Sequence, residues 1–240
     1  MLQPSPALSD PPSALDWPAL EAALESDGHA RVPALLSPSD CEALAALYEQ
    51  DALFRSTVVM ARHGYGQGAY RYFDSPLPPP VEDLRRAFYA GLAPLAQRWR
   101  EALGLEHPIP DRLEDFLGLC HAAGQTRPTP LLLRYGAGDY NCLHQDNYGA
   151  LAFPLQVAIC LSRRERDFTG GEFLLVEQRP RMQSRGTAIA LSQGEAVIFP
   201  NRTRPAQGRR GTYRLTVRHG VSRLLSGRRL TLGLIFHDAA

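Results

Sequence analysis

The sequence predicts an α+β protein with a mainly β core, folded as a double-sheet jelly roll with buttressing N-terminal helices. After residue 128, short apolar or alternating runs follow one another closely, and glycine-containing turns separate them. About eight short strands in a row are typical of a sandwich or barrel, and eight strands fit a jelly roll. The chain before them is rich in helix formers, which places helices against one sheet from outside. The predicted strands cover residues 129–135, 140–146, 153–161, 172–177, 187–191, 195–200, 212–219 and 229–237.

The N-terminal part begins with a predicted tail and two helices. Residues 1–16 are rich in proline and serine, which predicts a flexible tail. A short helix is expected at 18–26. A second helix is expected from Pro38 to about residue 50, because Ser37 is a good N-cap and proline suits the first helical position.

Two strands and a long helix are expected next. Residues 53–60 and 69–74 are predicted strands with a glycine-containing turn between them. A proline cluster ends the second strand, and a helix rich in Leu, Ala, Arg and Glu is expected at 81–103. We therefore divide the chain into the tail, a helical and mixed support region at 17–127, and a β core at 128–240.

The charge is balanced overall but unevenly distributed. The formal net charge is +1, so net charge indicates neither a nucleic-acid nor a membrane partner. All 26 basic residues are arginine, and nine of them lie between Asn201 and Arg229 with no acidic residue among them. This asymmetry indicates an anionic partner on one face, and a solvated strand surface explains it as well.

The cysteines and the N-terminus indicate the compartment. The four cysteines form no CxxC pair and fit neither a zinc ribbon nor a dense disulfide framework. No signal peptide is visible, and no apolar run approaches the ~18 residues that a membrane span needs. We therefore expect a cytoplasmic protein with reduced thiols, no membrane association and no obligate protein partner.

The motif that carries chemistry is His144-Gln145-Asp146. On a strand, positions i and i+2 point to the same face, so His144 and Asp146 would enter one cavity together. His219 lies on a predicted strand near the end of the set. Two imidazoles and one carboxylate form a facial triad that suits Fe(II) and leaves positions open for a cosubstrate and O₂. The alternative is a buried, hydrogen-bonded pair without a metal.

Arg229 is the candidate anchor for a cosubstrate. It lies ten residues after His219, beyond the next turn. A bidentate arginine is suited to bind the distal carboxylate of a dicarboxylic keto acid. Arg228 competes for this role, but strand alternation lets only one of the two face inward. The Ser226-Gly227-x-Arg229 spacing favours Arg229.

Together these motifs resemble the 2-oxoglutarate/Fe(II) dioxygenase superfamily. The matching pattern is His144-x-Asp146, then His219, then the Ser-Gly-x-Arg segment that ends at Arg229. Upstream, Tyr135-x-x-Gly138 resembles the prolyl-hydroxylase-like branch, and the double glycine at 170–171 matches a turn common between these motifs.

This resemblance implies a fold, ligands and an activity. The fold would be the double-stranded β-helix, with His144, Asp146 and His219 as iron ligands and no other catalytic residue. Arg229 would bind 2-oxoglutarate, and Tyr135 would add a hydrogen bond to it. The implied activity hydroxylates a substrate C–H bond with O₂ and releases succinate and CO₂, with ascorbate as a stimulant.

The stretch from Tyr140 to Asp238 also resembles a bacterial family described as oxygenases acting on damaged nucleic acid. The segments that carry this resemblance are HQDNYG, FPLQVA, FTGGEF, EQRPRMQSR, GTYRLTVRHGVSR and SGRRLTLGLIFHD. It implies oxidative demethylation or repair of alkylated nucleic acid. From the residues themselves, Arg179 and Arg181 are candidate contacts to a phosphate backbone, and a solvated hairpin explains them equally well. Tyr140 is a further candidate substrate contact. The last strand lacks the further arginine and asparagine of AlkB-type repair enzymes. A prolyl-type protein hydroxylase, a small-metabolite hydroxylase and a non-catalytic metal-binding jelly roll stay open as alternatives.

Overall fold

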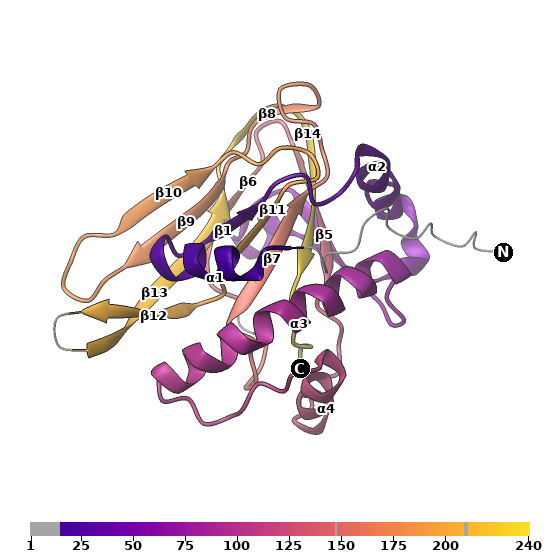
Figure 1. Cartoon of the computed structure of the whole chain (residues 1–240). Helices are drawn as coiled ribbons and strands as arrows, with labels where there is room; N and C mark the ends of the chain where they lie inside the picture. The colour runs from indigo at the N-terminus through magenta and orange to yellow at the C-terminus, as the bar shows by residue number, and fades with distance from the viewer. Residues whose placement is uncertain (1–14, 147, 209–210) are drawn as a thin grey trace.

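The computed structural model describes residues 15–146, 148–208 and 211–240, and two antiparallel sheets form its centre (Figure 1). The mainly β jelly roll with N-terminal helices is confirmed. The larger sheet has the order β1 (Ala30–Val32), β11 (Ala196–Pro200), β7 (Leu155–Cys160), β14 (Leu224–Leu234), β5 (Leu131–Gly136), β4 (Ala69–Phe73), β2 (Phe54–Val59), with β8 (Phe168–Gly170) on β14. The smaller sheet has the order β10 (Arg185–Ile189), β9 (Phe173–Gln178), β13 (Gly211–Val221), β6 (Tyr140–His144), β3 (Gly66–Gln67), with β12 (Thr203–Gly208) on β13.

The strand sequences reflect what covers each sheet. Every residue of β7 and β11 is buried, because helices cover one face of the larger sheet and the smaller sheet covers the other. β13 instead alternates, with Leu215 and Val217 buried and Arg214 and Arg218 exposed. The smaller sheet therefore packs on one face and presents the other to solvent.

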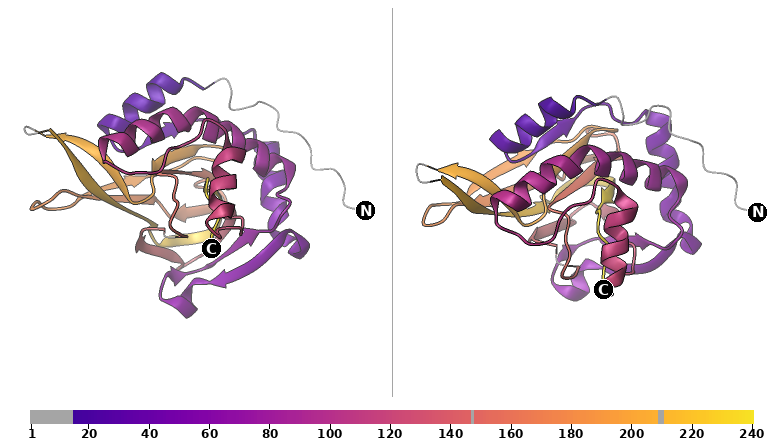
Figure 2. Two further views of the ribbon diagram at one scale, coloured as in Figure 1. Left: turned by 90° about the horizontal axis from the view of Figure 1, so that it is seen from below. Right: turned by 60° about the horizontal axis from the view of Figure 1, so that its bottom comes forward.

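Four helices buttress the larger sheet from outside. They are α1 (Trp17–Ser26), α2 (Pro38–Ala46), α3 (Pro79–Ala102) and α4 (Leu113–Ala122). The predicted start of α2 is confirmed: Ser37 and Asp40 form a capping box, with Pro38 in the first turn. α3 lies across the sheet (Figure 2), and its Leu84, Phe88 and Leu92 join the core cluster that contains the inward residues of β5, β7 and β14.

Several elements were not predicted from the sequence. The strands β1, β3 and β8 are short, and β12 contains a proline, which demotes a strand pattern. The helix α4 follows a proline-containing segment and has no side-chain cap, so none of these elements carries a strong local signal. β1, β2 and β4 come from the predicted support region yet pair into the larger sheet. Residues 1–14 of the predicted tail lie outside the described residues. Asp16, at its end, caps α1 by accepting a hydrogen bond from the Ala19 N–H.

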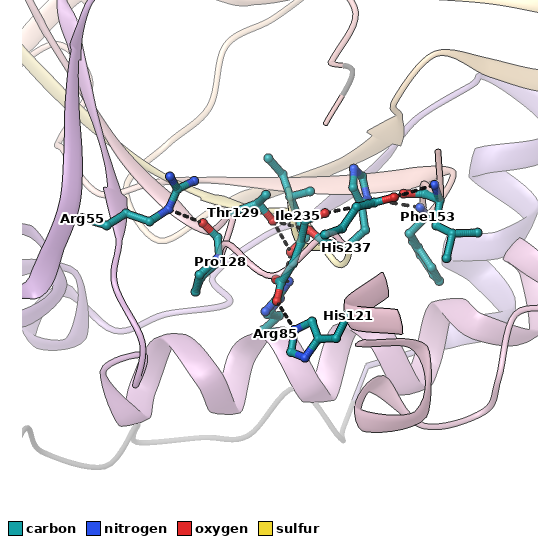
Figure 3. A network of polar contacts seen from close by, with 11 residues as sticks. Arg55, Arg85, His121, Pro128, Thr129, Phe153, Ile235 and His237 are labelled. Carbon is teal, nitrogen blue, oxygen red and sulfur yellow. Dashed lines mark hydrogen bonds and ion pairs between the residues drawn. The ribbon is translucent and has the colours of Figure 1, made fainter. Parts of the chain in front are cut away.

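A buried polar network fixes the segment that follows β14 (Figure 3). Arg85 on α3 donates to the Ile235 carbonyl at 2.8 Å and to the Asp238 carboxylate at 2.9 Å. His121 on α4 contacts the other Asp238 oxygen at 2.9 Å. His237 accepts a hydrogen bond at Nδ1 from the Phe153 N–H at 3.1 Å. These contacts tie both helices to the end of the strand that carries Arg229.

The helices also bear on membrane association. Within the described part of the chain, no helix combines the length and apolar character required to cross a membrane.

Candidate metal centre and its pocket

A cavity of about 610 Å³ lies between the two sheets. Its wall combines side chains of β4, β5, β7 and β14 from the larger sheet with side chains of β6, β9 and β13 from the smaller sheet. The predicted residues His144, Asp146, His219, Arg229 and Tyr135 all line it. Residues from 135–146 therefore meet His219 and Arg229 in one space.

The two histidines face each other across neighbouring strands. His144 ends β6 and stands opposite His219 on β13, with ring centroids 4.3 Å apart. Asp146 lies just beyond the end of β6, so the strand predicted at 140–146 is shorter than expected. Its Oδ1 is 3.6 Å from His144 Nε2, and its Oδ2 is 3.4 Å from His219 Nε2. The three potential ligand atoms lie within 4.8 Å of one another.

Protonation states in this group favour metal binding. His144 Nδ1–H donates to the Cys142 carbonyl at 2.8 Å, which leaves the Nε2 lone pair toward Asp146. Burial, and then the neighbouring His219, lower the pKa of His144 and keep its imidazole neutral. Burial alone would raise the pKa of Asp146, but hydrogen bonding from His219 and the nearby imidazoles hold it below its ordinary value. A neutral imidazole and a carboxylate are the ligating forms.

Neighbouring polar groups hold the carboxylate in place. Asp146 Oδ2 accepts from Gln156 Nε2 at 2.9 Å, and Oδ1 accepts from the Tyr148 hydroxyl at 3.1 Å. Tyr72 in turn donates to the Tyr148 hydroxyl at 2.9 Å. Sequence reasoning missed Gln156 and Tyr148. Gln156 did carry a signal, because it is the one polar residue of a fully buried strand.

Gln145, the middle residue of the motif, joins the turn to the smaller sheet. Its Nε2 donates to the carbonyls of Arg202 and Val217, both at 2.8 Å. Val217 lies two residues before His219 on β13. The amide therefore fixes the segment that bears His144 and Asp146 to the strand that bears His219.

Arg229 is a buried cation on the opposite wall. It is 1% exposed, and its Nη1 has no hydrogen-bond partner among the described residues. Arg229 pairs directly with Tyr135 on β5, so both side chains enter the cavity from the same face. Thr231, two residues on, also lines the cavity, and its hydroxyl has no hydrogen-bond partner in the described part of the chain. Burial raises the pKa of Tyr135 to about 12, which keeps its phenol a hydrogen-bond donor.

Three residues expected to contact substrate lie elsewhere. Tyr140 begins β6 outside the cavity wall, with the Arg223 guanidinium carbon 5.5 Å from its ring centroid. Arg179 and Arg181 lie in the turn of the β9–β10 hairpin (Figure 1). Arg179 lines a second cavity of about 450 Å³ instead. A substrate role for these three stays a prediction.

Cys142, two residues before His144 on the same strand, is exposed and lines the cavity. It lies near the end of β6, the strand that borders the cavity mouth, where its neighbour Leu143 is also exposed.

The sequence places the chain among known proteins. The profile of the Oxygenase-NA family, described as "Oxygenase, catalysing oxidative methylation of damaged DNA", matches residues 68–239. The chain belongs to the Oxygenase-NA family. It is therefore an oxygenase, an enzyme of the oxidoreductase class. Two uncharacterized Mycobacterium tuberculosis proteins, MT2286 of strain CDC 1551 / Oshkosh and Rv2227 of strain H37Rv, are each 56% identical over 172 residues, which is 72% of this chain and 74% of theirs.

Solved structures share the fold of this Oxygenase-NA protein. A Pseudomonas putida prolyl-4-hydroxylase is 16% identical with a TM-score of 0.53, covering 91% of this chain and 97% of its own. A 2OG-Fe(II) oxygenase family protein from Burkholderia pseudomallei is 16% identical with a TM-score of 0.52, covering 95% and 94%. A Trichoplax adhaerens prolyl hydroxylase is 14% identical with a TM-score of 0.55, covering 92% and 89%. The core is thus the double-stranded β-helix of the 2-oxoglutarate oxygenases.

Proposed function

We propose that this chain is an Fe(II)- and 2-oxoglutarate-dependent dioxygenase that hydroxylates a C–H bond of alkylated nucleic acid. The observation that carries the proposal is one cavity that joins the His144–Asp146–His219 group to a buried, uncompensated arginine on the facing strand. The metal-binding group alone would also suit a non-catalytic binding module. A second, cationic subsite gives that cavity the means to hold an anionic cosubstrate.

The residues present fit Fe(II). Two imidazole nitrogens and one carboxylate, with no thiolate among the three, form the donor set that leaves positions open on iron. His144, Asp146 and His219 would hold the metal. Gln156 and Tyr148 would orient the carboxylate, because both already donate to its two oxygens.

The residues present also fit 2-oxoglutarate. A buried guanidinium with an unpartnered Nη1 needs an anion, and no described acidic side chain is paired with it. Arg229 would bind the distal carboxylate as a bidentate clamp. Tyr135 and Thr231 would add hydrogen bonds from the same wall.

The chain would supply position and a dry site. When bound, Fe(II) supplies the oxidative chemistry that couples conversion of 2-oxoglutarate to succinate and CO₂ with hydroxylation by O₂. The protein holds the reactants together, and the apolar wall from Phe173, Phe199 and Ala158 excludes water. We assign no side-chain general base.

The family description supports nucleic acid as the substrate class. Hydroxylation of an N-methyl carbon forms an N–CH₂OH group, which releases formaldehyde and leaves the N–H. Oxidative demethylation thus needs no other catalytic step. A prolyl peptide is the second candidate, because the Tyr135-x-x-Gly138 pattern and the fold are both shared with prolyl hydroxylases.

The test measures succinate and formaldehyde from 2-oxoglutarate, air and Fe(II), with and without methylated single-stranded DNA. We expect DNA-stimulated turnover in the wild type and none in His144→Ala. His107→Ala, which removes an exposed histidine far from the cavity wall, is the matched control and should keep full turnover. Titration with Mn²⁺ should show a site in the wild type that His144→Ala loses. If the wild type shows no turnover and binds no metal, the proposal is overturned.

A further inference from the structure

The arginine-rich segment divides into buried and exposed members. Of the nine arginines between residues 201 and 229, Arg229 lies in the cavity wall. Arg204 is buried in an ion pair with Glu177 at 2.7 Å. Arg214 and Arg218 are exposed on β13, and neither has an ion-pair partner in the part of the chain that the structure describes. The last two therefore have no structural role that explains their charge.

These two arginines share the outer face of the smaller sheet. Leu215 and Val217 are buried between the sheets. Because side chains alternate along a strand, Arg214 and Arg218 point together to the solvent side. They are four residues apart, which is about 13 Å along the strand. Two guanidinium groups at this spacing cannot share one phosphate and would contact separate phosphates.

The same face holds no compensating acid. The strands β6, β9, β10, β12 and β13 contain a single acidic residue, Glu177. It is buried, and Arg185 and Arg204 bind it at 2.6 and 2.7 Å. The exposed positions of these strands are therefore neutral or basic. An uncompensated basic strand face favours a polyanion, and a neutral peptide backbone offers nothing to match it.

This face begins beside the metal centre. Arg218 directly precedes His219, and Gln145 of the cavity wall donates to the carbonyl of Val217 at 2.8 Å. From there the face extends along β13 to Arg214, away from the cavity. A strand lying on both arginines would pass close to the cavity at one end.

The cavity mouth offers surfaces for an unstacked base. Tyr65 is 51% exposed and Leu143 is 44% exposed, and both line the cavity. The Tyr65 ring stacks on His63 with centroids 5.3 Å apart, which fixes its orientation. Tyr65 is also held close to β6, because its carbonyl accepts from the Cys142 N–H at 2.9 Å. Exposed aromatic faces of this kind bind bases through stacking.

We propose that the outer face of β13 is a track for single-stranded nucleic acid, with Arg214 and Arg218 binding successive parts of its phosphate backbone. The strand then presents one nucleotide to the mouth at Tyr65 and Leu143. This inference rests on the proposed function, because the bound strand is the substrate of that cavity. It adds the route by which the strand reaches the metal centre.

The test compares Arg214→Ala/Arg218→Ala with Arg86→Ala/Arg112→Ala in the full chain. The control pair also removes two exposed positive charges, but from α3 and the α3–α4 connection on the other side of the larger sheet. Fluorescence anisotropy of a labelled oligothymidylate gives affinity as a function of salt, without metal or turnover. The Arg214→Ala/Arg218→Ala protein, the track variant, loses two phosphate contacts. The slope of log affinity against log salt concentration should therefore become shallower by about 1.4, and its affinity at 0.1 M salt should fall roughly 25-fold. The control variant should bind as the wild type does.

A third variant separates stacking from charge. Tyr65→Ala should keep the wild-type salt slope while its affinity falls about fivefold to a hundredfold, the effect of one stacked base. An unchanged slope in the track variant, or an equal loss in the control variant, overturns the inference. So does a wild type that binds no strand. Conversion of 2-oxoglutarate to succinate without substrate is measured on the same proteins. Succinate formation without strand binding means that the track is wrong while the oxygenase proposal stands.

Discussion

Replacing Arg229 with methionine should separate the stability of the protein from its affinity for 2-oxoglutarate. Methionine fills a similar space without charge, and the guanidinium it removes is 1% exposed with an unpartnered Nη1. An unsatisfied buried polar group costs about 1–3 kcal/mol, so Arg229→Met should stabilise the ligand-free protein by that amount. For a chain of this size, that gain raises the melting temperature by several degrees.

The same change should strongly weaken cosubstrate binding. Two charge-assisted hydrogen bonds to a carboxylate contribute about 1.5–3 kcal/mol each. Their loss weakens 2-oxoglutarate binding by about two to four orders of magnitude. Thermal unfolding with Mn²⁺ and increasing 2-oxoglutarate measures both the stability of the protein and its affinity for 2-oxoglutarate. A ligand stabilises the folded state by an amount that grows with the logarithm of its concentration relative to Kd.

Arg228→Met is the matched control. Arg228 is the exposed neighbour on the same strand, so this variant should change stability by less than about 0.5 kcal/mol and keep the 2-oxoglutarate response. An Arg229→Met protein that is less stable without ligand would show that Arg229 is a structural brace. A full 2-oxoglutarate response in that variant would remove it from the cosubstrate site.

Three further changes probe the rest of the site. Gln145→Glu keeps the shape of the side chain but removes both hydrogen bonds to the backbone carbonyls of Arg202 and Val217, so Mn²⁺ affinity measured by calorimetry should fall about tenfold; unchanged affinity would mean that these hydrogen bonds do not position the metal ligands. In Gly220→Ala the new Cβ would meet the Asn141 carbonyl oxygen at 2.7 Å, so β13 and β6 must separate beside His219, and metal affinity should fall more than in Gly186→Ala, where the space is open. Burial lowers the pKa of His237 from 6.5 to about 4, so between these pH values the unfolded chain takes up a proton that the folded chain does not. The wild type should therefore lose about 3 kcal/mol of stability as pH falls through that window, and urea unfolding should show a flatter profile for His237→Asn; parallel profiles would contradict this.

The sequence predicted the residues of the site better than their surroundings. The HxD motif, the distal His219 and Arg229 are spaced by strand geometry, and alternation decides which of Arg228 and Arg229 faces inward. These are local rules that hold in any strand. The strands predicted from alternating runs follow the same rules, and most lie within a few residues of those observed.

What the sequence did not reveal depends on tertiary contacts. Gln156 and Tyr148 meet Asp146 only because β7 and the turn after β6 approach it from different directions. Strand alternation places Cys142 on the same face as His144, but its exposure depends on where the cavity opens. β1 is three residues long, and its pairing with β11 brings together segments more than a hundred and fifty residues apart. Such pairings carry little sequence signal because a short strand has no periodicity of its own.

The pairing of β1 and of the β2–β4 hairpin has a consequence for the size of a working fragment. The region that matches the family profile begins at residue 68, after β1, β2 and β3. A fragment trimmed to that region would leave the backbone edges of β11 and β4 unpaired, and open edges recruit other chains into aggregates. It would also lack Tyr65, one side of the cavity mouth. The match to the family profile is therefore shorter than the described unit that pairs these sheet edges and completes the cavity mouth.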